Sequence, residues 1–374
     1  MKRLKQSTVL VTGATGYLAS HTIVELLKSG YEVIGIDNLA SSKRSVIPRI
    51  IRITDRSLTF RTVDIRDKSK LEDIFETYDL QSVIHFAGYK AVGESVENPM
   101  LYYSNNLAGS INLFEVMKKY DVKKLVFSSS CTVYGDSEVC PVTEENELNP
   151  TNPYGRTKLF TEQVLKDLSA SDSDWEITSL RYFNPIGAHP SGKLGEDPLG
   201  IPNNLFPYIT QTAIGQRESL NVFGGDYPTK DGTCVRDYIH VCDLAKGHIA
   251  AMECNDLDNF EVINLGTGKG YSVLEVIDTF EKVTGSKVPF KVVERREGDA
   301  AEVYANPDKA LKKLNWKAEK GLDEMCKDAW KWQTNFEKES NSVPLKINSS
   351  AYTNSSSNEM VDSTKTSLKR VKLS

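Results

Sequence analysis

The chain has 374 residues, and its 46 Lys and Arg against 51 Asp and Glu give a formal net charge of −5. Charges of both signs are interspersed, which argues against a nucleic-acid-binding or membrane-surface protein. No run of about 18 apolar residues occurs, so we expect no transmembrane helix. The first residues lead into a short strand instead of an apolar signal segment, and we expect a cytoplasmic protein.

Short β-branched runs alternate with helical periods through the first half of the chain. Strands are predicted over residues 8–12, 31–36, 58–63, 82–86, 124–128 and 176–182, and helices over 18–29, 68–78, 99–120 and the segment that begins near Tyr154. This alternation is typical of a parallel sheet covered on both faces. Residues 1–184 are therefore predicted to form an α/β, Rossmann-type doubly wound domain.

The alternation of predicted strands and helices ends after residue 184, where long loops contain many Gly and Pro residues. Helical periods return over residues 243–253, 272–284, 307–314 and 322–336. We predict a smaller α/β substrate-binding lobe over 185–336, with a segment about 235–265 that returns to the first domain. Residues 337–374 are rich in Ser, Asn, Thr and Lys, so they are predicted to be a disordered tail.

The chain's cysteines and histidines lack the spacing of a metal site. Its six Cys form no CxxC pair and its five His form no HExxH motif. We therefore predict no metal ion and free thiols in place of a disulfide framework.

A glycine turn follows the first predicted strand. Gly13 permits the tight turn, and Gly16 lets backbone amides approach a pyrophosphate at the start of the next helix. Asp37 follows the second strand roughly 20 residues further on, where a carboxylate accepts a hydrogen bond from the adenosine ribose. Because that charge would repel a 2′-phosphate, NAD is favoured over NADP as the cofactor.

The next two strands also end in polar or small residues. These are Asp64 and Ile65 after the third strand, and Phe86, Ala87, Gly88 and Lys90 after the fourth. Ligands bind at the carboxyl ends of strands in open α/β sheets, so these residues are candidates for the cofactor site. Ordinary turn chemistry is the alternative for each.

Tyr154 and Lys158 are spaced i, i+4 at the start of a predicted helix, so they share one face. A phenol has a pKa near 10, and a nearby ammonium favours its ionised form. Ser130, the last of three serines after the 124–128 strand, would hydrogen-bond the reacting oxygen; a turn cap is its alternative role. Tyr120 and Lys124 have the same spacing but lie where a helix gives way to a strand, so we discount them.

These motifs resemble the extended short-chain dehydrogenases/reductases, and among them the enzymes that invert C4 of UDP-hexoses. The likeness runs from about residue 8 to 336 and includes FSSSCTVYG at 127–135, RYFNPIGAHP at 181–190, GIPNNL at 200–205, VRDYIH at 235–240 and RREGD at 295–299. The resemblance implies an isomerase of galactose metabolism that interconverts UDP-glucose and UDP-galactose through a 4-keto sugar, with Tyr154 as base. It also implies a homodimer formed through the helices at 99–120 and 154–168.

The resemblance assigns further site residues. Those that would contact NAD are Tyr17, Leu18, Asn38, Asn105 and Phe183, and those that would hold UDP are Asn184, Asn204, Leu205, Leu220, Asn221, Phe223, Arg236, Arg296 and Asp299. Two arginines suit a diphosphate independently of the resemblance, because guanidinium groups bind it through paired hydrogen bonds. A surface ion pair is the alternative for each arginine.

Val303 stands where some members of the family carry tyrosine. Its smaller side chain predicts room for N-acetylated UDP-hexosamines.

The competing interpretations are another enzyme of the family, a dehydratase or decarboxylase, or a non-catalytic NAD-sensing regulator. A dehydratase would be expected to carry an acidic pair after Ser130, where this chain has Cys131 and Thr132, and a regulator would lack part of the Ser130, Tyr154 and Lys158 set.

Overall fold

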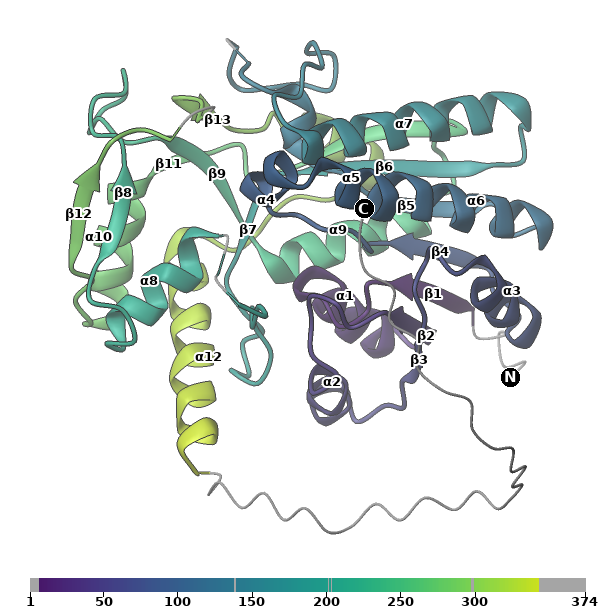
Figure 1. Cartoon of the computed structure of the whole chain (residues 1–374), viewed down its shortest axis with the longest axis horizontal. Helices are drawn as coiled ribbons and strands as arrows, with labels where there is room; N and C mark the ends of the chain where they lie inside the picture. The colour runs from purple at the N-terminus through teal and green to yellow at the C-terminus, as the bar shows by residue number, and fades with distance from the viewer. Residues whose placement is uncertain (1–6, 138, 201, 203, 297–298, 343–374) are drawn as a thin grey trace, which may run out of the picture.

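The computed structural model describes residues 7–137, 139–200, 202, 204–296 and 299–342 (Figure 1). Its main sheet has seven strands in the order β10-β6-β5-β4-β1-β2-β3, and every neighbouring pair is parallel. The strands are β1 (Thr8–Thr12), β2 (Glu32–Asp37), β3 (Thr59–Thr62), β4 (Ser82–His85), β5 (Lys124–Ser128), β6 (Glu176–Tyr182) and β10 (Phe260–Leu265). The predicted Rossmann-type fold class is confirmed.

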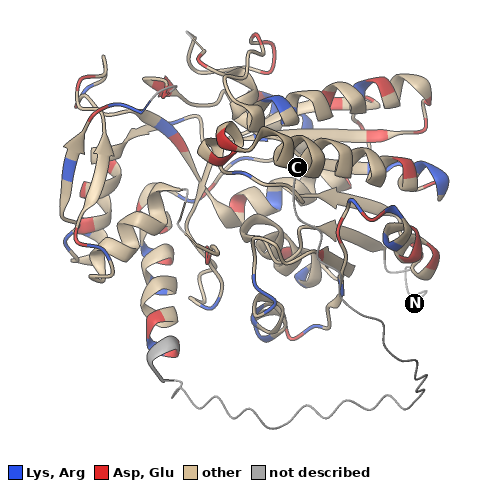
Figure 2. Ribbon diagram, in the orientation of Figure 1, with Lys and Arg blue, Asp and Glu red and all other residues tan. Residues whose placement is uncertain are grey.

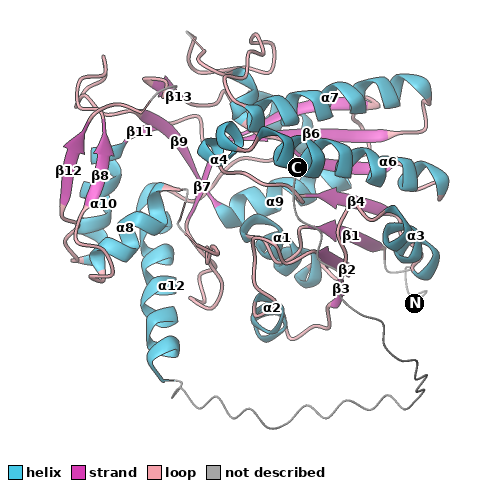
Figure 3. Ribbon diagram, viewed as in Figure 1, coloured by secondary structure: helices cyan, strands magenta, loops and turns pink. Residues whose placement is uncertain are grey.

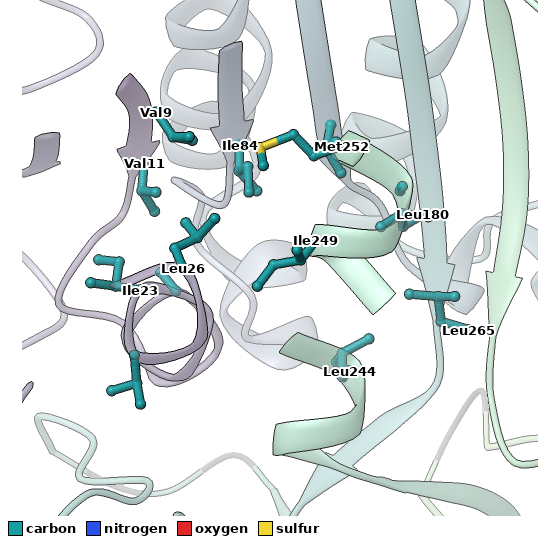
Figure 4. Packing of buried hydrophobic residues seen from close by; sticks show 14 of the residues in the cluster. Val9, Val11, Ile23, Leu26, Ile84, Leu180, Leu244, Ile249, Met252 and Leu265 are labelled. Atoms are coloured by element: carbon teal, nitrogen blue, oxygen red, sulfur yellow. The ribbon is translucent and has the colours of Figure 1, made fainter. Parts of the chain in front are cut away.

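Both faces of this sheet are covered by helices, which explains the uninterrupted apolar strands. Val9 and Val11 of β1 pack into one core with residues of α1 (Tyr17–Lys28) and α9 (Val241–Glu253), as Figure 4 shows. Leu10, between them, packs on the opposite face with residues of α3 (Lys68–Thr77), α6 (Gly109–Lys119) and α7 (Pro153–Ser171). The period-two alternation of side chains along the strand separates these two cores.

The second lobe is a smaller mixture of helices and short strands (Figure 3). Its helices α8 (Leu205–Ala213), α10 (Val273–Thr284) and α12 (Leu322–Ser342) share a hydrophobic core with strands β8 (Leu220–Phe223) and β9 (Val235–His240). The remaining strands pair around these two: β7 (Asn184–Ile186), β11 (Gly270–Ser272) and β13 (Glu302–Val303) with β9, and β12 (Phe290–Val293) with β8. Helix α11 (Asp308–Leu314) packs against the first domain at β10 and α9.

The segment predicted to return to the first domain is divided between the two units. Its β9 lies in the second lobe, whereas α9 and β10 belong to the first domain. The division follows from pairing, because β10 aligns in parallel with β6 from Phe260 opposite Ile177 to Leu265 opposite Tyr182.

Two predicted helices have different bounds in the structure. The helix predicted over 99–120 consists of α5 (Pro99–Tyr102), a π-helix (Tyr103–Ala108) and α6. Helix α12 continues to residue 342, past the predicted end at 336, and an ion pair of 2.8 Å between Arg49 Nη2 and Glu339 Oε2 ties its polar end to α2 (Val46–Thr54). Residues 343–374 of the predicted tail lie outside the described residues.

Candidate active site

The turn after β1 is shaped for close backbone approach. Gly13 has φ +68°, and a Cβ atom there would lie 2.9 Å from the backbone nitrogen of Ala87, so only glycine fits. Gly16 is the N-cap of α1 and supplies no side chain to cap the helix. The first amides of α1 are thus available to a phosphate, and the helix dipole favours the negative charge.

Asp37, at the end of β2, is fixed beside the glycine turn. Its Oδ2 accepts a hydrogen bond of 3.1 Å from the Thr15 amide, and its Oδ1 accepts one of 2.7 Å from the Leu39 amide. The side chain is buried but lies at the carboxyl edge of the sheet. Turn and carboxylate together fit the pyrophosphate and ribose of a dinucleotide that lacks a 2′-phosphate.

The residues after β3 form a polar group with Asn38. Asn38 Nδ2 donates to Asp64 Oδ2 over 3.0 Å, and Arg66 forks onto both oxygens of Asp64 at 3.0 and 2.7 Å. Hydrogen bonding from Arg66 is the main cause that holds the pKa of Asp64 well below its usual range. Ile65 is buried, and a Cβ at Gly109 would lie 2.8 Å from its side chain. Sequence reasoning missed Arg66.

The end of β4 is joined to the glycine turn and to the π-helix. The Ala87 amide donates to Thr12 Oγ1 over 3.1 Å, which holds this loop against the end of β1. Asn105 Nδ2 donates to Asn106 Oδ1 over 2.9 Å, and that same oxygen lies 3.4 Å from where a Cβ of Gly88 would stand. The turns after β1 and β4 therefore form one unit with the buried Asn105 and Asn106 of the π-helix, and π-helical turns are frequent at functional sites.

Four other candidate cofactor residues make contacts with different parts of the molecule. The Tyr17 hydroxyl donates to the Gly187 carbonyl over 2.7 Å, and Leu18 packs against the core beneath α1. The Phe86 ring contacts the His248 ring at a tilt, with ring centroids 4.6 Å apart. Phe183 is buried in a cluster with Val303. Tyr17 and Phe183 thus lie where the first domain meets the second lobe.

The N-terminus of α7 positions the candidate catalytic tyrosine. Asn152 caps the helix by accepting a 2.9 Å hydrogen bond from the Gly155 amide, and Pro153 supplies the first helical residue. A Cβ at Gly155 would lie 2.9 Å from the Thr132 carbonyl oxygen. Glycine at 155 thus lets α7 pack closely on the 3₁₀ turn Cys131–Tyr134, which Ser130 caps through a 3.2 Å bond from the Thr132 amide.

Burial dominates the electrostatics of this group. It raises the pKa of Tyr154 well above the ordinary value, with a smaller increase from Tyr182, while hydrogen bonding with Ser130 lowers it. Burial also lowers the pKa of Lys158 to about 8. Lys158 Nζ donates to the Ser128 carbonyl over 2.7 Å and lies 5.9 Å from the centroid of the Tyr154 ring. The structure brings the three predicted residues together in one buried group.

A buried ion pair that sequence reasoning missed lies one helical turn beyond Lys158. Arg181 Nη2 on β6 donates to Glu162 Oε2 on α7 over 2.6 Å, and both side chains are almost fully buried. Ser129 Oγ donates to Glu162 Oε1 over 2.6 Å. The pair therefore joins α7, β6 and the serine segment, and the Glu162 charge opposes the decrease in the Lys158 pKa. No local motif in the sequence signals it, because its members are 19 residues apart.

The two predicted diphosphate-binding arginines converge on one carboxylate. Arg296 Nε donates to Asp299 Oδ2 over 2.8 Å, and Arg236 Nη2 lies 3.8 Å from Asp299 Oδ1. The Arg296 guanidinium also lies 4.9 Å from the centroid of the Phe223 ring. The ring beside Arg296 suits a nucleotide base, and the two arginines suit a diphosphate.

The other substrate candidates frame the same lobe. Asn204 is the N-cap of α8 and Leu205 its first residue, Asn184 begins β7, and Val303 on β13 is in register with Arg236 on β9. On β8, Leu220 is buried and Asn221 is exposed. Asn204 Nδ2 donates to Glu196 Oε1 over 2.7 Å, and Glu196 is a contact that sequence reasoning missed.

No described helix is long and apolar enough to cross a membrane.

Comparisons with known proteins show the family of this chain. The family model described as GDP-mannose 4,6 dehydratase matches residues 10–329. UDP-glucose 4-epimerase of Bacillus subtilis (strain 168) is 55% identical over 327 residues, which are 87% of this chain and 96% of the relative. The same-named protein of Bos taurus is 54% identical over 333 residues, 87% of this chain and 96% of the relative.

A solved structure extends the likeness to three dimensions. The crystal structure of UDP-glucose 4-epimerase from Bifidobacterium longum in complex with NAD+ and UDP has a TM-score of 0.86 and 51% identity, and covers 88% of this chain and 98% of that one. Fold and site define an extended short-chain dehydrogenase/reductase, an enzyme class that the resemblance predicted. Within that class, the chain belongs to the UDP-glucose 4-epimerase family.

Proposed function

We propose that this chain is an isomerase that reversibly converts UDP-glucose and UDP-galactose by NAD-dependent epimerisation at C4 through a 4-keto intermediate. The observation that carries the proposal is the convergence of Ser130, Tyr154 and Lys158 at the end of β5, two strands from the glycine turn of β1. The B. longum relative, 51% identical, was solved with NAD+ and UDP. Bound NAD supplies the acceptor for the hydrogen that leaves C4.

Tyr154 would act as the base that takes the proton from the sugar 4-hydroxyl. Because burial is the largest of the causes that raise the pKa of this phenol, positive charge must favour its ionised form at neutral pH. Lys158 supplies one such charge in the same buried site, and Ser130 would hydrogen-bond the reacting oxygen. The same residues return the proton when the ketone is reduced from its other face.

The second lobe would hold the UDP group. We propose that Arg236, Arg296 and Asn204 bind the diphosphate, with Asp299 orienting both arginines. Phe223, Leu220 and Asn221 would line the uracil, with Leu205 and Asn184 completing the site. Affinity placed on the nucleotide leaves the hexose free to turn between the oxidation of C4 and the reduction of the ketone.

A dehydratase or decarboxylase and an NAD-sensing regulator are the alternatives. Cys131 and Thr132 follow Ser130 in the 3₁₀ turn, so the acidic pair expected of a dehydratase is missing from that position. The regulator is disfavoured because Ser130, Tyr154 and Lys158 are all present and buried together. The discriminating experiment incubates purified protein with UDP-galactose and follows UDP-glucose. Formation of UDP-glucose supports the epimerase, whereas a dehydrated or decarboxylated sugar nucleotide, or no turnover, rejects it.

N-acetylated UDP-hexosamines are a proposed second substrate class. Val303 is in register with Arg236 and packs with Phe183, so its size helps define the space beside the sugar. Conversion of UDP-N-acetylglucosamine should be measurable and should fall in Val303→Tyr, while UDP-glucose conversion is kept. Failure of the parent enzyme to convert it under conditions that convert UDP-glucose would reject this extension.

We also propose a cytoplasmic homodimer that serves galactose metabolism. All six cysteines are free thiols, which is typical of a reducing compartment. Exposed apolar side chains on neighbouring helices support self-association and include Val96, Met100 and Phe160.

A further inference from the structure

We infer that Glu196 is a positioning residue that couples the cofactor site to the UDP site. The inference rests on the proposed function, because it takes Lys90 as a cofactor-site residue and Asn204 as a UDP-site residue. The observation behind the inference is that Lys90 and Asn204 share a single carboxylate oxygen as their hydrogen-bond acceptor. Glu196 Oε1 accepts hydrogen bonds from Lys90 Nζ over 2.9 Å and from Asn204 Nδ2 over 2.7 Å.

The two donors come from different halves of the molecule. Lys90 follows β4 of the main sheet, whereas Asn204 caps α8 of the second lobe. The Glu196 side chain is only 11% exposed, so this charge is less screened by water than a surface carboxylate. It also acts on the N-terminus of α1, where the pKa of Tyr17 is raised mainly by burial and secondly by the Glu196 charge.

The backbone that carries Glu196 is held by helix α12. Trp332 Nε1 on α12 donates to the Glu196 carbonyl over 3.3 Å. A Cβ at Gly195 would lie 2.4 Å from the Trp332 ring, so the preceding residue must be small. Arg49 of α2 covers the same ring at 5.0 Å from its centroid. The carboxylate is therefore presented from a fixed position, as a positioning role requires.

Asp197 provides a matched control in the same segment. Its Oδ1 pairs with Lys43 Nζ over 2.7 Å, and neither partner is among the candidate site residues. Asp197→Asn thus removes the same charge from the adjacent position without touching Lys90 or Asn204. Glu196→Gln removes the charge from the shared contact while keeping the shape of the side chain.

The test measures UDP affinity by calorimetry on NAD-loaded enzyme and the rate of NAD loss on dilution. Glu196→Gln should weaken UDP binding and speed NAD loss, each by about tenfold, since a charge-assisted hydrogen bond is lost on each side. Asp197→Asn should change both by less than about twofold. Lys90→Met should weaken UDP binding in the parent enzyme and have no further effect in the Glu196→Gln background.

The inference holds only if UDP affinity falls and NAD loss speeds up in the same variant. A change in one alone or in neither overturns it, as does an equal effect of Lys90→Met in the two backgrounds. A general loss of structure would lower the unfolding midpoint of Glu196→Gln but would not make the Lys90→Met effect disappear. Because UDP and NAD binding are measured apart from turnover, a parent enzyme without epimerase activity rejects the proposed function and not the coupling.

Discussion

At the residue scale, the proposed chemistry depends on the Tyr154 hydroxyl. Tyr154→Phe removes the atom that exchanges the proton and leaves the buried ring in place. We expect kcat to fall by about a thousandfold, within the range of a lost general base. UDP affinity should stay near that of the parent, because we propose that the other lobe holds the substrate nucleotide. Undiminished interconversion of UDP-glucose and UDP-galactose would contradict the assigned role.

The buried charge of Lys158 should lower the stability of the fold, in addition to the role that we propose for this residue in catalysis. Its pKa is about 8 instead of 10.5, so burial disfavours the folded ammonium by roughly 3 kcal/mol. Below pH 8 both folded and unfolded chains hold the proton, and the full penalty is present. Between pH 8 and 10.5 the folded protein has lost the proton while the unfolded chain keeps it, so stability rises with pH as the penalty disappears.

The substitution Lys158→Met tests whether the buried ammonium destabilises the folded protein. At pH 7 the variant should be inactive yet more stable by about 1–2 kcal/mol, after the lost hydrogen bond to the Ser128 carbonyl is subtracted. The difference in stability between the variant and the parent should shrink as the pH approaches 10.5. Urea unfolding of NAD-free parent and variant at pH 7 and pH 10 provides the comparison. A variant less stable than the parent at pH 7 would refute the burial penalty.

At the element scale, local patterns predicted the central strands and the helix that carries Tyr154 but not the pairings between distant segments. Strands β1 and β6 have the predicted bounds, and the apolar run of β1 lies between Ser7 and the turn at Gly13. The edge strand β10 follows β6 in the sheet by a pairing that spans about 80 residues, which no local period encodes. The Glu162–Arg181 pair and Glu196 were missed for the same reason, since each contact depends on the folded geometry.

Gly155 sets the distance between α7 and the 3₁₀ turn after β5. In Gly155→Ala the new Cβ would lie 2.9 Å from both the Thr132 carbonyl oxygen and the Pro150 side chain, so the start of α7 must move. A displacement of about 1 Å can reduce kcat on the order of a hundredfold, which we expect here with UDP affinity preserved. Steady-state kinetics and UDP titration measure the two effects.

Gly93 offers the control for that change. It lies in the helix α4 (Val92–Glu97), and a Cβ there meets nothing within 4 Å. Gly93→Ala should leave kcat unchanged and stabilise the helix by a few tenths of a kcal/mol to about 1 kcal/mol. Equal kinetic losses in the two variants would show that the loss does not arise from contact with the 3₁₀ turn.

At the scale of the whole molecule, side-chain contacts connect the two lobes around the site. The tie between Arg49 on α2 and Glu339 on α12 spans the lobes, as does the Lys43–Asp197 pair. Figure 2 shows Lys and Arg interspersed with Asp and Glu over both halves of the described chain, without separation of the two signs. The lobes therefore meet through specific pairs, and the Glu196 contact belongs to this set.

The helices on the outer face of the first domain form the proposed dimer contact. Val96 on α4 is 62% exposed, Met100 on α5 is 74% exposed, and Phe160 on α7 is 38% exposed and stacks on Tyr103 with ring centroids 6.2 Å apart. These helices pack on one another, so their apolar side chains can form one self-complementary surface.

Met100→Glu places a charge in the middle of this surface, and burying it against a second copy would be unfavourable. We expect the parent to sediment as a dimer at micromolar concentration and the variant to dissociate about a hundredfold more readily. Leu311 on α11 is 50% exposed and lies away from these helices, so Leu311→Glu should leave the dimer intact. A parent that sediments as a monomer, or equal dissociation of the two variants, would assign these exposed apolar residues to another role.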